Sequence, residues 1–135
     1  MNIPTDNANK LNKVLIADDD PTIRSMMQSI LEAAGYQVVA CEDGEQAATQ
    51  LEEKDFSAGL AFVVLDIMMP GMTGLDVLTR MKLNSNIATI PVIMLTAENK
   101  DSDIIVGYEQ GADYYITKPF TRQQLLFGIQ TALGV

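Results

Sequence analysis

The sequence predicts an α/β domain built on a parallel sheet of five strands. Short apolar runs alternate with stretches of helical periodicity along the 135-residue chain, as in a succession of βαβ units. Four of these runs end in polar residues that can carry chemistry: Asp18 with Asp19, Asp66, Thr96 and Lys118. Because parallel strands deliver their carboxyl ends to one edge of a sheet, we expect these side chains to meet in one crevice.

The first half of the domain is expected to hold three strands, at residues 14–17, 36–40 and 61–65. Asp20 and Pro21 begin the first helix, since Asp is a strong N-cap and Pro suits the first helical position, and Gly35 ends it. A second, more polar helix is expected from Glu45 to about Lys54. The third strand is apolar throughout, which is typical of a central strand buried on both faces.

The second half continues the alternation, with strands expected at residues 92–95 and 114–117. Pro and Gly make residues 67–74 a loop, and the spacing of Leu75, Leu78 and Met81 predicts a third helix after it. Asp101 or Ser102 can cap a fourth helix that runs to about Gln110. Thr121 and Gln124 have the capping-box pattern of a fifth helix.

One domain at residues 13–135, preceded by a mobile polar arm at residues 1–12, accounts for the whole chain. Its net charge of −9 disfavours direct binding to nucleic acids, which requires Lys and Arg against the phosphates. No apolar stretch is long enough to cross a bilayer, and no signal peptide is visible. We therefore expect a cytoplasmic protein without membrane contact.

The chain contains one cysteine and no histidine. Cys41 therefore has no partner for an internal disulfide and is interpreted as a small buried apolar residue. Without histidine there is no His-based triad, no His-ligated zinc and no His general base. The chemistry left to this chain is that of carboxylates, hydroxyls and amines.

Adjacent carboxylates at Asp18 and Asp19 repel each other unless a cation lies between them. Mg²⁺ binds in proteins through one or two carboxylates together with phosphate oxygens and waters, so the pair indicates a magnesium site. Each residue alone has a simpler interpretation: Asp20 as a helix cap, Asp66 as a turn residue, Lys118 as a surface base. Their joint position at strand ends favours a site that holds a metal and a phosphoryl group together.

Four segments carry a resemblance to a known family: VLIADDDP (residues 14–21), VLDIMMPGMTG (64–74), VIMLTA (92–97) and GADYYITKPF (111–120). With these motifs the chain resembles the response-regulator receiver domain of two-component signalling, from about residue 13 to about residue 133. The resemblance implies a doubly wound, flavodoxin-like sheet in the strand order 2-1-3-4-5.

The resemblance also implies a role for each site residue. Asp66 would be the nucleophile that becomes an aspartyl phosphate. Asp19 and Asp66 would bind Mg²⁺ directly, the backbone carbonyl of Met68 would complete the protein ligands, and Asp18 would act through water. Lys118 would pair with the phosphate, and the family suggests a cis peptide bond between Lys118 and Pro119.

A conformational switch is part of the same resemblance. Thr96 would hydrogen-bond the phosphate, and Tyr115 would be the aromatic residue that then turns inward. This would bias a surface formed by the fourth helix, the fifth strand and the fifth helix, through which dimerisation on phosphorylation is also expected. Met68 and Glu98 flank the route of attacking water, so the Met68 side chain either shields the acyl phosphate or is loop packing.

The implied partners are a sensor histidine kinase or a histidine phosphotransfer protein as donor, and a downstream protein target or an output domain as receiver of the signal. Whether the protein acts alone or as part of a longer one stays open. No enzymatic activity is expected beyond assistance to its own phosphorylation and dephosphorylation.

Three other classes of protein share features with this sequence. The pattern Asp18-x-Asp20-x-Thr22 fits the nucleophile motif of haloacid-dehalogenase-type phosphatases, but no acidic metal ligand follows Lys118. A receiver-like interaction module that is never phosphorylated would lack a site residue, and none is missing. A flavin carrier would need a phosphate loop after the first strand, where the three aspartates would repel a phosphate.

Overall fold

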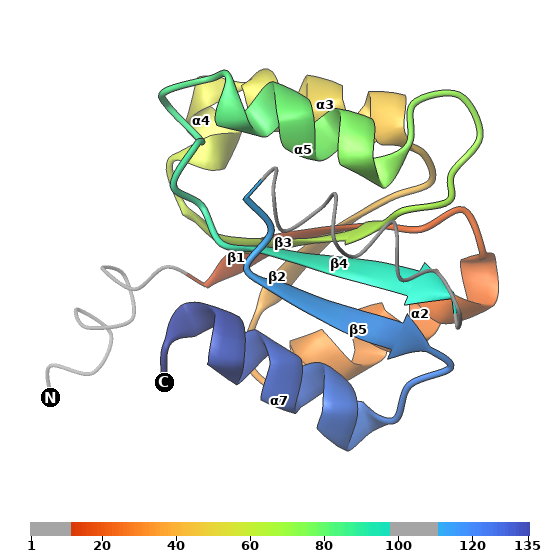
Figure 1. Ribbon diagram of the computed structural model, residues 1–135. Helices are drawn as coiled ribbons and strands as arrows, with labels where there is room; N and C mark the ends of the chain where they lie inside the picture. Colours follow the sequence, from red (N-terminus) through yellow and green to blue (C-terminus); the bar gives the residue numbers. More distant parts are fainter. Residues whose placement is uncertain (1–11, 98–110) are drawn as a thin grey trace, which may run out of the picture.

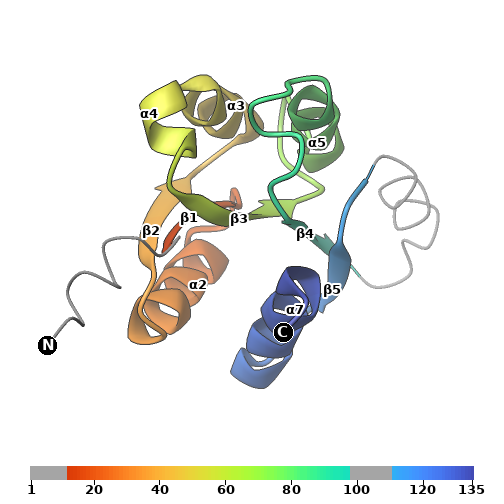
Figure 2. The same cartoon turned by 90° about the vertical axis from the view of Figure 1, so that its left-hand side faces the viewer.

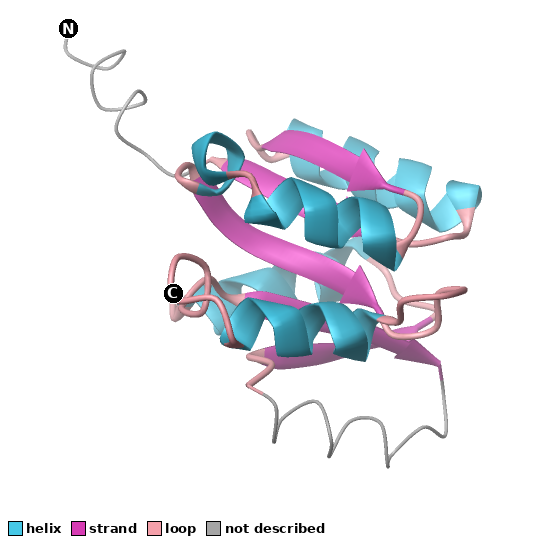
Figure 3. Ribbon diagram, turned by 90° about the horizontal axis from the view of Figure 1, so that it is seen from above, coloured by secondary structure: helices cyan, strands magenta, loops and turns pink. Residues whose placement is uncertain are grey.

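The computed structural model describes residues 12–97 and 111–135, which hold one five-stranded sheet (Figure 1). The strands are β1 (Lys13–Ala17), β2 (Gln37–Cys41), β3 (Leu60–Asp66), β4 (Val92–Ala97) and β5 (Tyr114–Lys118). All neighbours pair in parallel in the order β2-β1-β3-β4-β5, so the predicted fold class and strand order are confirmed. All the arrowheads in Figure 3 point toward the same edge of the sheet.

The described helices are α2 (Pro21–Ala33), α3 (Gly44–Glu52), α4 (Lys54–Ser57), α5 (Gly74–Lys82) and α7 (Arg122–Leu133). Figure 2 shows α2 and α7 on one face of the sheet and α3, α4 and α5 on the other, which is the doubly wound arrangement. The predicted arm, apart from Asn12, and the helix predicted between Asp101 or Ser102 and Gln110 lie outside the described residues.

Each face of the sheet has its own apolar cluster, because successive side chains of a strand point to opposite faces. In β1, Leu15 belongs to the cluster under α3 and α5, whereas Val14 and Ile16 belong to the cluster with α2 and α7. All seven residues of β3 are buried, as predicted for a central strand. Burial of each large aliphatic side chain stabilises the fold by about 1.5–3 kcal/mol. The well-packed sheet therefore holds the residues at its edge in fixed positions.

Local capping sets where the helices begin. The Asp20 side chain accepts hydrogen bonds from the backbone N–H groups of Thr22 and Ile23 and caps α2, as predicted. The capping box predicted at Thr121 is present at the start of α7. A second capping box, which the sequence analysis did not identify, starts α5 at Thr73.

The polar helix predicted from Glu45 to about Lys54 is α3, which ends slightly earlier, at Glu52, and is followed by a short helix, α4, that was not predicted. Glu53 has extended backbone (φ −79°, ψ 114°) and ends α3. Its side chain accepts from the Asp55 N–H at 2.9 Å and starts the short α4, which buries Phe56. A glutamate that caps the next turn therefore breaks the helix where its propensity alone would continue it. Within the described ranges, no helix has the length and apolar character needed to cross a membrane.

Candidate functional site

The predicted site residues come from four adjacent strands. Asp66 is the last residue of β3, Thr96 lies near the end of β4, and Lys118 is the last residue of β5. Asp18 and Asp19 directly follow β1, which pairs with β3. The strand order therefore places all of these residues at one edge of the sheet, as predicted.

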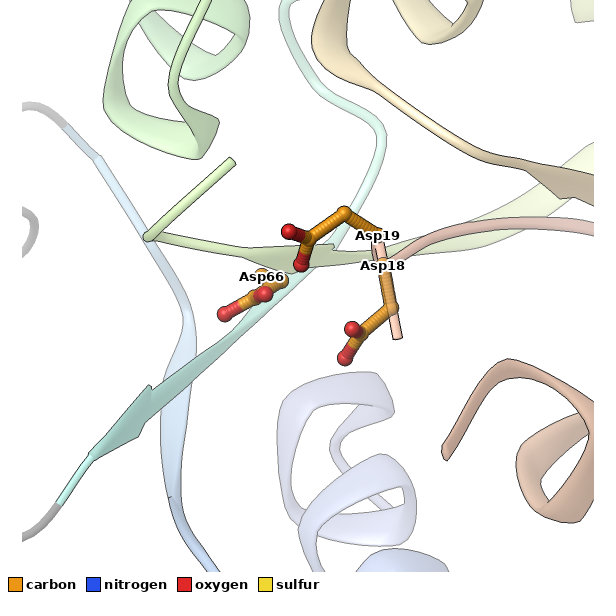
Figure 4. Close-up of side chains that lie close together, drawn as sticks. All are labelled: Asp18, Asp19 and Asp66. Carbon is orange, nitrogen blue, oxygen red and sulfur yellow. The ribbon is translucent and has the colours of Figure 1, made fainter. Parts of the chain in front are cut away.

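Three carboxylates converge there (Figure 4). Asp18, Asp19 and Asp66 each place a carboxylate oxygen within 4.8 Å of the other two. Asp18 is 0% exposed and Asp66 is 4% exposed, whereas Asp19 lies at the surface. The cluster thus consists of two buried carboxylates, those of Asp18 and Asp66, and one at the surface, that of Asp19.

Lys118 inserts its ammonium between the two buried carboxylates. Its Nζ lies 2.9 Å from Asp18 Oδ2 and 3.2 Å from Asp66 Oδ2. Asp18 Oδ2 is buried and has no well-aligned hydrogen bond from the described residues, so the ion pair is what holds it. Asp18 Oδ1 accepts a hydrogen bond from the Asp20 N–H at 2.9 Å.

These contacts shift the proton equilibria of the site. Burial, and next the charge of Asp18, raise the pKa of Asp66 to about 6, against the opposing effect of Lys118. Burial lowers the pKa of Lys118, but its short contact with Asp18 and the charges of Asp66 and Asp18 outweigh burial, so that its pKa is raised overall. With these pKa shifts, Asp66 is mainly ionised and Lys118 is protonated at neutral pH.

The donor set fits a magnesium ion. All three donors are carboxylates, the hard oxygen ligands that Mg²⁺ prefers. They exceed the single ammonium by two negative charges, which a divalent cation would balance. The Met68 N–H donates to Asp66 Oδ1 at 3.3 Å, so the backbone at Met68 follows the edge of the site.

Two glycines allow the loops around Asp66 to close, a role that the sequence analysis missed. A Cβ at Gly74 would collide with the backbone carbonyl oxygen of Asp66, and a Cβ at Gly44 would collide with that of Met72. The Gly74 N–H also donates to the Ile67 carbonyl at 3.0 Å. The glycines were visible only as loop and turn residues in the sequence, because close contacts between distant segments leave no local pattern.

Of the two predicted switch residues, Thr96 lies at the same edge of the sheet as the site, and Tyr115 lies farther back along β5. Thr96 is 1% exposed, and its hydroxyl donates to the Ala97 carbonyl at 3.3 Å. Tyr115 is half-buried against the apolar cluster under α3 and α5 and pairs with Met94 across β4 and β5. The peptide bond between Lys118 and Pro119 is cis, as the resemblance implied.

Comparison with known proteins decides the family. The family model described as "Response regulator receiver domain" matches residues 14–130. The chain belongs to the response-regulator receiver family. This membership sets aside the haloacid-dehalogenase-type phosphatase and the flavin carrier.

Relatives of known name include the transcriptional regulatory protein CpxR of Escherichia coli K12, 37% identical over 123 residues, which cover 91% of this chain and 50% of CpxR. The DNA-binding response regulator MtrA of Mycolicibacterium smegmatis is 35% identical over 121 residues, 90% of this chain and 50% of MtrA. The chain thus spans about half the length of these curated relatives.

Solved structures of the same fold cover the receiver almost completely. The chemotaxis protein CheY4 of Vibrio cholerae has a TM-score of 0.82 and 32% identity, and the match covers 91% of this chain and 99% of CheY4. A putative response regulator from Chloroflexus aurantiacus has a TM-score of 0.83 and 32% identity, with 93% and 100% coverage.

Proposed function

We propose that this protein is a phosphoacceptor receiver in which Asp66 takes a phosphoryl group in a Mg²⁺-dependent reaction. The observation that supports this most directly is the convergence of Asp18, Asp19 and Asp66 with the Lys118 ammonium at the carboxyl end of the sheet. Residues at the ends of three separate strands, β1, β3 and β5, form this cluster, and packing of the core does not require it.

The donor would be a phosphohistidine of a sensor histidine kinase or of a histidine phosphotransfer protein. An oxygen of the Asp66 carboxylate attacks phosphorus, the P–N bond of the phosphohistidine breaks, and its electron pair returns to the imidazole, which is then protonated. The product is an acyl phosphate on Asp66. No general base is needed because the nucleophile is already ionised at neutral pH.

The obstacle to this reaction is repulsion between two anions. Asp19, Asp66 and the Met68 carbonyl would hold Mg²⁺ directly and Asp18 through water. Bound there, the ion would offset the repulsion and stabilise charge on the transferring group. Lys118 already contacts Asp66 at 3.2 Å, so its ammonium is placed to pair with the phosphate that forms.

The signal would leave through a change of surface. Thr96, buried beside Asp66 on the neighbouring strand, would bond the new phosphate, and Tyr115 would turn toward the space that is vacated. This would bias a surface made of β5, α7 and the segment 101–110, which lies outside the described residues.

The downstream receiver of the signal would be a protein target or an output domain of a longer protein, with dimerisation through the same surface. CpxR and MtrA are named as a transcriptional and a DNA-binding regulator. Transcriptional output is therefore one form that the signal could take, carried by an output domain rather than by this acidic chain. A cytoplasmic location, where such kinases present their phosphohistidine, belongs to the same proposal.

The test is phosphorylation with acetyl phosphate. With Mg²⁺ we expect intact-mass spectrometry to detect one phosphoryl adduct, which Asp66→Asn or removal of Mg²⁺ by EDTA abolishes. Asp55→Asn is the matched control, because Asp55 is exposed on α4 at the opposite end of β3 from Asp66. Absence of an adduct from the wild type, both here and with a histidine kinase, would instead favour the interaction module that is never phosphorylated.

A further inference from the structure

The loop between β1 and α2, which carries Asp18 and Asp19, is tied down by backbone contacts. The Asp18 N–H donates to the Cys41 carbonyl at 3.2 Å. On the other side of the residue, Arg24 of α2 donates from Nη1 to the Asp18 carbonyl oxygen at 2.7 Å. The Arg24 contact is a hydrogen bond from a charged donor, a class that is shorter and stronger than neutral hydrogen bonds.

This bond acts on two predicted ligands at once. The peptide unit is planar, so a fixed Asp18 carbonyl also fixes the N–H of Asp19 on the same plane. The Asp19 side chain is exposed, and no hydrogen bond or ion pair from the described residues holds its carboxylate. The direction of that carboxylate therefore depends on the backbone that Arg24 holds.

Backbone hydrogen bonds at the start of α2 hold Arg24 in place. Asp20 caps α2, and the Arg24 N–H donates to the Asp20 carbonyl at 2.9 Å in the first turn. Asp18 precedes α2 in the chain, and Arg24 in the first turn of α2 forms a hydrogen bond back to the Asp18 carbonyl. Arg24 is half-buried, and within the described part of the chain its guanidinium forms no ion pair with a carboxylate.

We infer that Arg24 is a positioning residue of the metal site, which holds the Asp18 carbonyl so that the Asp18 and Asp19 carboxylates face Asp66. The inference rests on the proposed function, which supplies the Mg²⁺. Residues that orient metal ligands without touching the metal typically change metal affinity by about 10–100-fold when they are replaced.

The sign of the effect separates positioning from charge. Removal of a positive charge close to a cation site strengthens Mg²⁺ binding if electrostatics alone acts. Loss of a positioning contact weakens it. The two interpretations of Arg24 therefore predict opposite changes in the dissociation constant.

The experiment is a calorimetric Mg²⁺ titration of the wild type, Arg24→Gln, Arg24→Lys and Arg80→Gln. We expect Arg24→Gln to weaken binding by about 10-fold and Arg24→Lys, which keeps a charged donor but not the planar fork, to weaken it less. Arg80→Gln is the charge-matched control, because Arg80 is exposed near the C-terminal end of α5 and its contact to Glu52 is long, at 3.7 Å. It should bind Mg²⁺ like the wild type.

Two further measurements are specific to positioning. Without metal, the Asp20 amide, which donates to Asp18 Oδ1, should exchange its hydrogen faster in Arg24→Gln than in the wild type. The acetyl phosphate reaction of Arg24→Gln should slow at low Mg²⁺ and recover at saturating Mg²⁺, since Asp66 and Lys118 are unchanged.

Mg²⁺ binding by folded Arg24→Gln that equals or exceeds that of the wild type overturns the inference, as does an equal loss in Arg80→Gln. If Arg24→Gln does not fold, folded Arg24→Lys with unchanged affinity and unchanged Asp20 exchange overturns it. A wild type that binds no Mg²⁺ overturns the proposed function as well, whereas normal wild-type binding together with normal Arg24→Gln binding removes only the role of Arg24.

Discussion

At the scale of single residues, Asp66 occupies an environment that disfavours its own charge. Burial and the neighbouring Asp18 raise its pKa from the ordinary 3.8 to about 6, and Lys118 compensates only in part. A carboxyl with a higher pKa in the folded than in the unfolded protein binds its proton more tightly when folded. The stabilisation of the folded protein by this bound proton is present below about pH 4 and is lost as the pH rises through about 6.

Asp66→Asn should therefore stabilise the metal-free protein at neutral pH. Through this group the wild type should lose up to about 3 kcal/mol of unfolding free energy between pH 4 and pH 7, and the variant should not. Urea unfolding in EDTA at pH 7 and pH 4 measures the difference between the two proteins, which should shrink at the lower pH. A variant that is no more stable than the wild type at pH 7 would contradict this account of Asp66.

Substitution of Met68 tests whether its side chain sets the lifetime of the acyl phosphate. Its side chain is 58% exposed beside Asp66, so its replacement should change stability by less than about 0.5 kcal/mol. We expect Met68→Asn to shorten the half-life of the acyl phosphate several-fold, because a smaller polar side chain admits water to phosphorus. The half-life is measured as the loss of the phosphoryl adduct after acetyl phosphate is removed. Met26→Asn is the control, because Met26 is also exposed. An unchanged rate would leave Met68 as loop packing.

The site residues could be predicted because each has a distinctive chemical type at the end of an apolar run. Arg24 could not, since its partner is a backbone carbonyl that leaves no mark in the sequence. The ion pairs of Lys118 with two carboxylates likewise depend on side-chain positions, which strand order alone does not define.

At the scale of elements, the loop between β3 and α5 depends on Gly74. Gly74→Ala should destabilise the protein by about 1–3 kcal/mol and weaken Mg²⁺ binding, because the new methyl group meets the Asp66 carbonyl. Gly59→Ala is the matched control at the other end of β3, where a Cβ meets only the Lys13 side chain at 3.6 Å. Urea denaturation measures the free energy of unfolding of the two variants. Equal values for Gly74→Ala and Gly59→Ala would refute the close contact at Gly74.

The strands were predicted well because a strand buried on both faces is an uninterrupted apolar run, as in β3. The predicted helix from Glu45 extended slightly past the end of α3, and α4 was not predicted, because Glu53 is a good helix former that here acts as a cap. The capping box at Thr73 was missed, since the residue that completes it is Asp76, whereas the usual pattern has Glu or Gln at that position.

At the scale of the whole molecule, the account predicts a switch between two surfaces. Beryllofluoride with Mg²⁺, an acyl phosphate analogue, should shift the NMR signals of Tyr115 and of α7. Thr96→Val should bind the analogue and lose most of these distant shifts, because the hydroxyl that connects the two regions is gone. Thr96→Ser should keep them. Shifts confined to the residues next to the metal in the wild type would contradict the switch.

The central claim, that Asp66 is the phosphoacceptor, is tested most directly by chemical trapping. Sodium borohydride reduces an acyl phosphate, so a phosphorylated aspartate becomes homoserine and can be located by peptide mapping. After acetyl phosphate and Mg²⁺ we predict homoserine at position 66 and at no other aspartate, and none when EDTA replaces Mg²⁺. Homoserine at Asp18, Asp19 or another aspartate, or its absence from position 66, would contradict the claim.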